Sequence, residues 1–356
     1  MALTDIAWDA FLELDPVEKS RHLNQDDGRP FHVLMTRQFD RKALDTLGEL
    51  ATRIRFLAKT KEGMTFLAGL LPHRRAMLYF TQPSTRTFLS FCSACEILGM
   101  RIGNVRDTAT SSELKGETKD DSVRTFSSYF DCVVMRTQVG GLAERMAWVL
   151  SNSERPVPII NAGSGKDQHP TQALLDIYTL QRSFEDCGGI DGKTVVFVGD
   201  LLRGRTVRSL SALLTNYEGV HQVFIAPPEL QVADDVLAIL DASHVTYEQG
   251  DDLAAAVPKA DAIYMTRVQD EWDTEKGASA KIDIERYWLK ETHLEQLKPD
   301  AVIMHPLPRR HEIPPSIDND PRAVYWRQMR NGMWIRTALL ATIFECDGDI
   351  YAFSQA

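Results

Sequence analysis

The sequence contains few cysteines and lacks any long apolar run. Its 356 residues include five cysteines, an odd and sparse set that does not fit a disulfide framework. No stretch approaches the roughly 18 consecutive apolar residues of a membrane-spanning helix, and the start shows no basic segment followed by an apolar one. These absences predict reduced thiols, no contact with a membrane and a location in the cytoplasm.

Positive charge is also scarce. Forty Lys and Arg residues stand against 50 Asp and Glu residues, which gives a formal net charge of -10. A chain with this balance repels the phosphate backbone of nucleic acid, so we do not expect nucleic acid as a partner. The hydrophobic share of 44% and the charged share of 25% are typical of globular proteins. The length is sufficient for about two domains.

Cys92 and Cys95 form a C-x-x-C motif. They lie in an apolar pattern at helical spacing that continues to Leu98, and the sequence offers no second pair to complete a zinc site. Free cysteine behaves as a small hydrophobic residue. We therefore interpret both as core residues rather than as metal ligands or a redox pair.

Short apolar segments alternate with helical patterns along most of the chain. The segments with the length and composition of buried strands are 76–80, 101–105, 132–136, 157–161, 194–198, 222–225, 245–248, 262–266 and 301–305. Amphipathic stretches such as 42–57, 118–129 and 206–214 fill the gaps. This alternation predicts an α/β fold with two doubly wound parallel-sheet domains joined by helices.

The domain boundaries follow from the same pattern. Residues 1–30 are polar and mixed in charge, and we interpret them as an N-terminal extension. The alternation places a first domain at 31–185, which ends with a connecting helix, and a second domain at 186–324. The closing stretch 325–344 is apolar at helical spacing, and we expect residues 325–356 to form a C-terminal helix that packs back on the first domain.

Two predicted strands are followed by motifs that open a helix. After the first strand come Ser84, Thr85, Arg86 and Thr87, whose hydroxyls, backbone N–H groups and guanidinium could converge on a phosphate or carboxylate. A plain N-terminal cap with a surface arginine is the alternative. The segment 169–172 begins with His169, which a helix N-terminus keeps neutral and able to donate to a carbonyl oxygen. A capping histidine is the alternative there.

The second half offers two further candidate sites. The loop from Gly199 to Thr206 is similar to the phosphate loop G-x-x-x-x-G-K-[ST], with Arg205 in place of lysine. That replacement disfavours an NTPase but leaves Arg205 as a candidate anion ligand. In the segment 305–308, prolines on both sides of Leu307 leave its carbonyl without a competing local amide, so it can accept from a ligand NH2 group. A cis Leu307–Pro308 bond is compatible with this segment, and a rigid loop is the alternative.

Together these motifs resemble those of the aspartate and ornithine carbamoyltransferases. The sequences S-T-R-T at 84–87, H-P-T-Q at 169–172 and H-P-L-P at 305–308 occur in the family's order and spacing. The resemblance extends from about residue 31 to the end. It implies transfer of the carbamoyl group of carbamoyl phosphate to an amine, a reaction that requires no metal and no cofactor.

The resemblance implies a role for each matched residue. The phosphate of carbamoyl phosphate is held by Ser84, Thr85, Arg86, Thr87 and Arg136. The catalytic residues around the carbonyl oxygen are Arg86, Thr87, Arg136 and His169. The carbamoyl NH2 group is fixed by Gln172, the Leu307 carbonyl and Pro308. Ser111 and Lys115 reach into the site from a neighbouring subunit, which implies a homotrimer with shared sites.

The acceptor is inferred from charge. Aspartate carries two carboxylates, which favour arginine, whereas ornithine carries a distal ammonium, which requires an acid. The residues assigned to aspartate are Lys115, Arg205, Arg267 and Gln269. Pro306 stands where ornithine enzymes usually carry cysteine, and the segment 309–313 is similar to the aspartate branch. We therefore predict formation of N-carbamoyl-L-aspartate and phosphate in de novo pyrimidine (UMP) biosynthesis.

Three positions depart from the aspartate branch. Gln82 replaces a usual Glu, an Arg expected near Trp272 is missing, and Leu114 replaces a second Lys. The first two changes remove both partners of an ion pair together, which is less damaging than leaving one charge unpaired. The alternatives are a transcarbamoylase for another amino acid or amine, a non-catalytic homologue and an NTPase. The partners compatible with the family also include a regulatory subunit or a pathway enzyme.

Overall fold

The computed structural model describes residues 3–106, 116–165, 168–243, 245–273, 275 and 282–355. The chain divides into two compact units, which we call unit 1 (Met1–Leu175 with Arg330–Ala356) and unit 2 (Asp176–Met329). The divisions fall inside helices α8 (Pro170–Ser183) and α13 (Tyr325–Ile343), whereas the sequence placed boundaries at residues 185 and 324. No helix in the described ranges is long and apolar enough to span a membrane.

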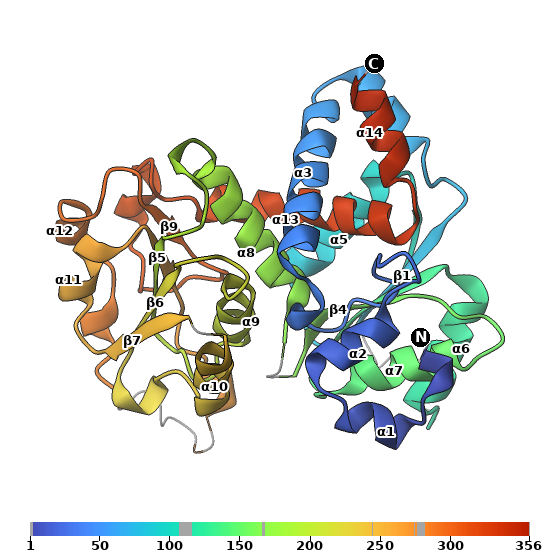
Figure 1. The fold of residues 1–356 in the computed structure, drawn as a ribbon, viewed down its shortest axis with the longest axis horizontal. Helices are drawn as coiled ribbons and strands as arrows, with labels where there is room; N and C mark the ends of the chain where they lie inside the picture. The colour runs from blue at the N-terminus through green and yellow to red at the C-terminus, as the bar shows by residue number, and fades with distance from the viewer. Residues whose placement is uncertain are drawn as a thin grey trace. The chain divides into compact units, whose positions relative to one another are not determined.

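Unit 1 is built on a parallel sheet with the strand order β2-β1-β3-β4 (Figure 1). The strands are β1 (Arg75–Phe80), β2 (Arg101–Val105), β3 (Cys132–Thr137) and β4 (Ile159–Ser164). The flanking helices include α3 (Arg41–Leu57), α4 (Lys61–Ala68), α5 (Thr85–Ile97), α6 (Lys119–Tyr129), α7 (Leu142–Ser151) and α14 (Asp347–Gln355). Every side chain of β3 is buried, as expected for a strand covered on both faces.

Unit 2 is built on a five-stranded parallel sheet with the order β7-β6-β5-β8-β9 (Figure 1). The strands are β5 (Thr194–Val198), β6 (His221–Ile225), β7 (Thr246–Gly250), β8 (Ala262–Met265) and β9 (Val302–Met304). The helices include α9 (Arg205–Leu214), α10 (Asp234–Ala242), α11 (Leu253–Ala256) and α12 (Glu291–Leu294). The predicted α/β class with two parallel sheets is confirmed.

Each sheet contains a point where the strand order reverses. In unit 1 the chain runs from β1 outward to β2 and then returns to β3 on the other side of β1. In unit 2 it runs from β5 outward to β7 and then returns to β8 on the other side of β5. Open parallel sheets bind ligands at such switch points, beyond the carboxyl ends of the strands. The fold therefore defines one candidate binding edge in each unit.

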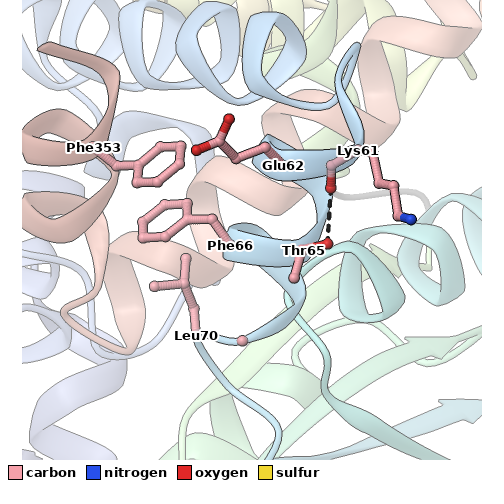
Figure 2. Close-up of a pocket in the computed structure, with 7 residues that line it drawn as sticks. Lys61, Glu62, Thr65, Phe66, Leu70 and Phe353 are labelled. Atoms are coloured by element: carbon pink, nitrogen blue, oxygen red, sulfur yellow. Dashed lines mark hydrogen bonds between the residues drawn. The ribbon is translucent and has the colours of Figure 1, made fainter. Parts of the chain in front are cut away.

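Helix α4 was not predicted from the sequence, and α14 lies within the stretch 325–356 that was predicted as one C-terminal helix. They meet through Phe66 and Phe353, whose rings stack with centroids 3.9 Å apart, as Figure 2 shows. Helix α14 also contacts α3, where the Arg53 guanidinium donates to the Ser354 hydroxyl over 2.9 Å. A shallow depression beside the ring pair contains none of the predicted site residues (Figure 2).

The N-terminal extension is part of the unit 1 core. It forms α1 (Trp8–Glu13) and α2 (Pro16–Leu23), and Asp15 caps α2 with a reciprocal bond from the Asp15 N–H to Glu18. Three of its apolar side chains, Leu3, Phe11 and Leu23, are buried in the same cluster as the sheet residues Met77 and Tyr79. Although this segment is mostly polar, its few apolar side chains pack into the core of unit 1.

Of the two cysteines in the C-x-x-C motif, Cys95 is a core residue, as predicted, whereas Cys92 is only partly buried. All five cysteines are unbonded, and Cys95 is fully buried on α5. Burial raises the pKa of the Cys95 thiol. Burial also raises the pKa of the Cys132 thiol, at the start of β3, to about 12. These thiols are therefore protonated and unreactive at neutral pH.

His32 is a buried structural histidine that joins three parts of unit 1. Its Nδ1 accepts from the Ile159 N–H over 3.0 Å, so the ring proton lies on Nε2, which donates to the Ser151 hydroxyl over 2.9 Å. Burial lowers the pKa of His32 to about 3. The imidazole is neutral in the folded protein over the whole physiological range.

We predict that His32 makes unit 1 less stable in mild acid. The unfolded chain protonates this imidazole near pH 6.5 but the folded chain does so only near pH 3. The contribution of His32 is therefore complete above pH 6.5 and is lost as the pH falls toward 3. The slope should be up to about 1.4 kcal/mol per pH unit.

Urea unfolding of the wild type and His32→Gln, from neutral to mildly acidic pH, measures this slope. The variant should be less stable at neutral pH but should lose less stability on acidification. Equal slopes for the two proteins would show that His32 does not titrate on unfolding.

Candidate functional site

The first cluster of predicted residues lies at the switch point of unit 1. Ser84 precedes the first residue of α5, and the loop before it is fastened to β3 because the Thr81 and Gln82 N–H groups both donate to the Arg136 carbonyl. The Ser84 side chain makes no capping hydrogen bond to the helix. This observation disfavours a plain cap as the role of Ser84 and is compatible with a ligand-binding hydroxyl.

Arg136 supplies positive charge at the same edge. It lies near the end of β3, is 9% exposed, and donates from Nη1 to the Ala162 carbonyl over 3.0 Å. This bond orients the guanidinium from the neighbouring strand without neutralising its charge. Arg86 lies in the first turn of α5, so the strand pairing of β1 with β3 brings the two motifs to one edge.

The second motif of unit 1 begins α8, as predicted. Pro170 is the first residue of this helix, and the His169 carbonyl accepts from the Gln172 and Ala173 N–H groups. The side chains of His169 and Gln172 are both buried. They follow β4, the strand next to β3, and so belong to the same carboxyl edge of the sheet.

Arg336 is a site-supporting residue that sequence reasoning missed. It reaches from α13 with 2% exposure and donates to the Ser90 hydroxyl of α5 over 2.7 Å. It also lies 3.5 Å from the Thr171 hydroxyl of α8. A side chain at Gly332 would come within 2.8 Å of the Arg336 guanidinium. The available signal was a lone arginine in an apolar helical stretch with a glycine one turn before it.

The second cluster lies at the switch point of unit 2. Asp200 follows β5, is fully buried, and accepts from the Gln269 N–H over 2.9 Å and the Arg203 N–H over 3.1 Å. Burial raises the pKa of the Asp200 carboxyl, although these bonds act in the opposite direction. Asp200 therefore fastens the loop after β8 to the loop after β5, and the sequence analysis did not identify it.

Gly199 permits the close approach of these two loops. Its φ is +113°, and a side chain there would lie 2.3 Å from the Thr266 carbonyl oxygen. The Thr266 hydroxyl donates to the Val198 carbonyl over 2.9 Å. Only glycine fits this position without displacing the backbone.

The predicted acceptor residues follow directly from these loops. Arg205 is the first residue of α9, and Arg267 and Gln269 come after β8. The Arg267 guanidinium binds both carboxylate oxygens of Glu271 and donates to the Val268 carbonyl. The Arg267 bonds hold the pKa of Glu271 below its usual value. A substrate carboxylate at Arg267 must therefore share it with Glu271 or replace Glu271.

The loop after β5 does not resemble a phosphate loop in its hydrogen bonding. The Leu201 and Leu202 N–H groups donate to the Leu230 carbonyl, and the Arg203 N–H donates to Asp200. A phosphate loop instead directs successive N–H groups at the ligand. The NTPase alternative is disfavoured on this ground.

Some predicted residues lie outside the described ranges. Ser111, Leu114 and Lys115 belong to this group, as does most of the loop 269–281. The segment 305–308 is described, and the Leu307–Pro308 bond is cis, as the sequence analysis allowed. Within the described part of the chain, no group of three or more His, Cys, Asp or Glu side chains could hold a metal ion.

Comparison with known proteins identifies the family. The model of the aspartate/ornithine carbamoyltransferase carbamoyl-phosphate-binding domain matches residues 32–182, and that of the Asp/Orn-binding domain matches residues 191–343. The chain belongs to the aspartate/ornithine carbamoyltransferase family. The resemblance stated from the motifs is therefore confirmed.

Relatives support this placement. The chain is 40% identical to aspartate carbamoyltransferase 1, chloroplastic, of Pisum sativum, over 87% of this chain and 78% of the pea protein. It is 42% identical to the aspartate carbamoyltransferase catalytic subunit of Vibrio cholerae, over 77% and 86%. The Trypanosoma cruzi aspartate transcarbamoylase, solved with carbamoyl phosphate and aspartate, aligns with a TM-score of 0.80 at 34% identity over 93% and 99%.

We predict that Asp200→Asn weakens acceptor binding. An asparagine side chain offers one acceptor oxygen, so its NH2 group would face one of the two N–H donors and release either Gln269 or Arg203. Loss of one bond to a charged group should raise the aspartate KM about tenfold or more. Steady-state kinetics measure this change.

Asp261→Asn is the matched control. Asp261 accepts from the Thr194 N–H over 2.8 Å at the opposite, amino-terminal edge of the same sheet. The Asp261→Asn substitution should leave the aspartate KM unchanged. An unchanged aspartate KM in Asp200→Asn would mean that this carboxylate does not position the acceptor loop.

Proposed function

We propose that the chain is an aspartate carbamoyltransferase, which transfers the carbamoyl group of carbamoyl phosphate to the amine of L-aspartate. The products are N-carbamoyl-L-aspartate and phosphate, in de novo pyrimidine biosynthesis. The observation that carries the proposal is that residues of the family's motifs follow the strands at each of the two switch points. Unit 1 supplies donor-binding groups, and unit 2 supplies arginines for a dicarboxylate.

On the donor side, the first turn of α5 and two guanidiniums bind the phosphate. Backbone N–H groups at a helix N-terminus and the charges of Arg86 and Arg136 favour a dianion. As the amine attacks, negative charge develops on the carbonyl oxygen, which Arg86, Thr87, Arg136 and neutral His169 stabilise as donors. The same cations stabilise the departing phosphate, which can accept the proton of the amine.

The remaining contacts orient the reacting groups. Gln172, the Leu307 carbonyl and Pro308 hold the carbamoyl NH2 group, so that the carbonyl carbon faces the amine. Arg205, Arg267, Gln269 and Lys115 hold the aspartate carboxylates. Because the reaction joins the two substrates, both sets of residues must act on one substrate pair, and this proximity lowers the barrier by as much as about 7 to 11 kcal/mol.

We further propose a homotrimer in the cytoplasm. Ser111 and Lys115 would come from a neighbouring copy of the chain, so an isolated subunit should be inactive. The free state of all five cysteines supports a reducing compartment. A regulatory subunit or another pathway enzyme is a further partner that sedimentation of the purified protein with candidate proteins would test.

The test of the function is product formation by the purified protein. Carbamoyl phosphate should yield an ureido product with aspartate but not with ornithine, lysine or putrescine. Arg86→Ala should lower turnover on the order of 10² to 10³-fold with the fold intact, because it removes charge stabilisation in the transition state. Turnover only with another acceptor would reject aspartate, and silence with all four would favour a non-catalytic homologue.

Arg267→Ala tests the acceptor assignment separately. Loss of a bidentate contact to a carboxylate should raise the aspartate KM about 10- to 100-fold, with little change in the KM for carbamoyl phosphate. Arg286→Ala is the control, because Arg286 is an exposed arginine of unit 2 that lies 3.4 Å from Asp251. If both variants keep the wild-type aspartate KM, the acceptor binds elsewhere.

A further inference from the structure

Leu307 has a backbone conformation that residues other than glycine rarely adopt. Its φ is +56°, in the left-handed region. This conformation costs a residue with a Cβ atom roughly 1 to 2 kcal/mol, so surrounding contacts must hold it. Such residues are concentrated at functional sites, where the conformation directs a backbone group.

The backbone of this segment has one N–H group available to hold it. Pro306 and Pro308 carry no backbone N–H, which leaves that of Leu307 as the sole donor between residues 306 and 308. This N–H donates to Nδ1 of His305 over 2.7 Å. The backbone hydrogen bond that holds Leu307 in this conformation thus requires an unprotonated Nδ1 on the His305 imidazole.

Glu312 fixes the tautomer of that imidazole. Nδ1 of His305 accepts a hydrogen bond from the Leu307 N–H, so the ring proton lies on Nε2, which donates to Glu312 over 2.8 Å. Both side chains are buried, with exposures of 1% and 8%. Burial acts to raise the pKa of Glu312, but the interaction with His305, together with backbone hydrogen bonds that include the Arg310 N–H, outweighs this effect and lowers the pKa. The carboxylate is therefore charged and keeps the proton on Nε2.

Further buried bonds hold His305 in place within unit 2. The backbone N–H of His305 donates to the side-chain oxygen of Gln328 over 2.9 Å, and the Gln328 side-chain NH2 group donates to Asp176 over 2.7 Å. The Tyr264 hydroxyl donates to the same carboxylate over 2.8 Å. These contacts connect β8, α8 and α13 to the segment after β9, so the ring has a fixed position before substrate binds.

We propose that His305 is a positioning residue, which holds the Leu307 N–H through Nδ1 while Glu312 fixes its tautomer, so that the Leu307 carbonyl points at the carbamoyl NH2 group. This inference rests on the proposed function and adds to it two residues, His305 and Glu312, that need not touch the substrate. It also gives a reason for the burial of the Glu312 carboxylate beside the imidazole.

Two substitutions at one position separate positioning from packing. In His305→Asn, the side-chain oxygen lies on the same Cγ atom as Nδ1 and can accept from the N–H two residues later, as in an Asx turn. His305→Leu keeps apolar bulk but removes the acceptor. A role in packing alone would make leucine at least as good as asparagine.

The kinetic expectation follows from where each contact lies. His305→Leu should lower kcat on the order of 10²-fold, the cost of a group misplaced by about 1 Å. Its KM for carbamoyl phosphate should change less than about threefold, because phosphate binds to residues of unit 1. His305→Asn should stay within about tenfold of the wild-type kcat.

A spectroscopic signature tests the tautomer directly. In ¹⁵N-histidine-labelled protein, the His305 signals, assigned by their loss in His305→Asn, should show protonated Nε2 and unprotonated Nδ1. In Glu312→Gln this tautomer preference should weaken and kcat should fall, because the amide can either accept from Nε2–H or donate to Nε2. A protonated Nδ1 in the wild type would overturn the inference.

His32→Leu is the matched control for substitution of a buried histidine. His32 also accepts a backbone N–H at Nδ1 and contacts a side chain through Nε2, but in unit 1. It should lower stability and leave kcat unchanged. Equal loss of kcat in His305→Leu and His305→Asn, or no loss in His305→Leu, would overturn the inference in an active enzyme. A wild type that forms no ureido product would instead overturn the proposed function itself.

Discussion

Parallel pairing of β1 with β3, and of β5 with β8, is the constraint on which both halves of the chemistry depend. Each pair lies where the strand order of its sheet reverses, so the loops that leave it diverge and open an edge for ligands. Motifs separated by about fifty residues in sequence, such as that of Arg86 and that of Arg136, reach one edge only because of this pairing. The loops are then fastened by bonds to buried groups, namely the Arg136 carbonyl in unit 1 and the Asp200 carboxylate in unit 2.

Hydrogen bonds within each unit orient the arginines at the two edges. Arg136, which we propose to bind the phosphate, donates to the Ala162 carbonyl, and this bond orients the guanidinium. Arg267 instead binds the Glu271 carboxylate, so an aspartate carboxylate must compete with an internal anion. In a chain with a formal net charge of -10, the proposed function requires local guanidiniums, rather than the overall charge balance, to attract two anionic substrates.

Much of the fold was predictable because buried parallel strands are short apolar runs, and the sequence places all nine within a few residues of their observed bounds. Helix α4 was missed because it is short. The separation of α14 from α13 was missed because tertiary contacts, such as the stacking of Phe66 on Phe353, determine where α14 packs. The site residues recognisable from sequence are those in contiguous motifs. Arg336 and Asp200 were not recognised, nor was the role of Glu312 within the matched segment 309–313, because these roles come from partners that only the tertiary fold brings close. The roles of Ser111 and Lys115 stay predictions.

The central claim is that the donor residues of unit 1 and the acceptor residues of unit 2 act on one pair of substrates. N-(phosphonacetyl)-L-aspartic acid, which the Trypanosoma cruzi enzyme binds, joins both substrate groups in one molecule. Calorimetric titration of the wild type, Arg86→Ala and Arg267→Ala with this compound is the most direct measurement. The account predicts tight binding that each substitution alone weakens strongly. Binding that depends on Arg86 but is the same in Arg267→Ala would contradict it.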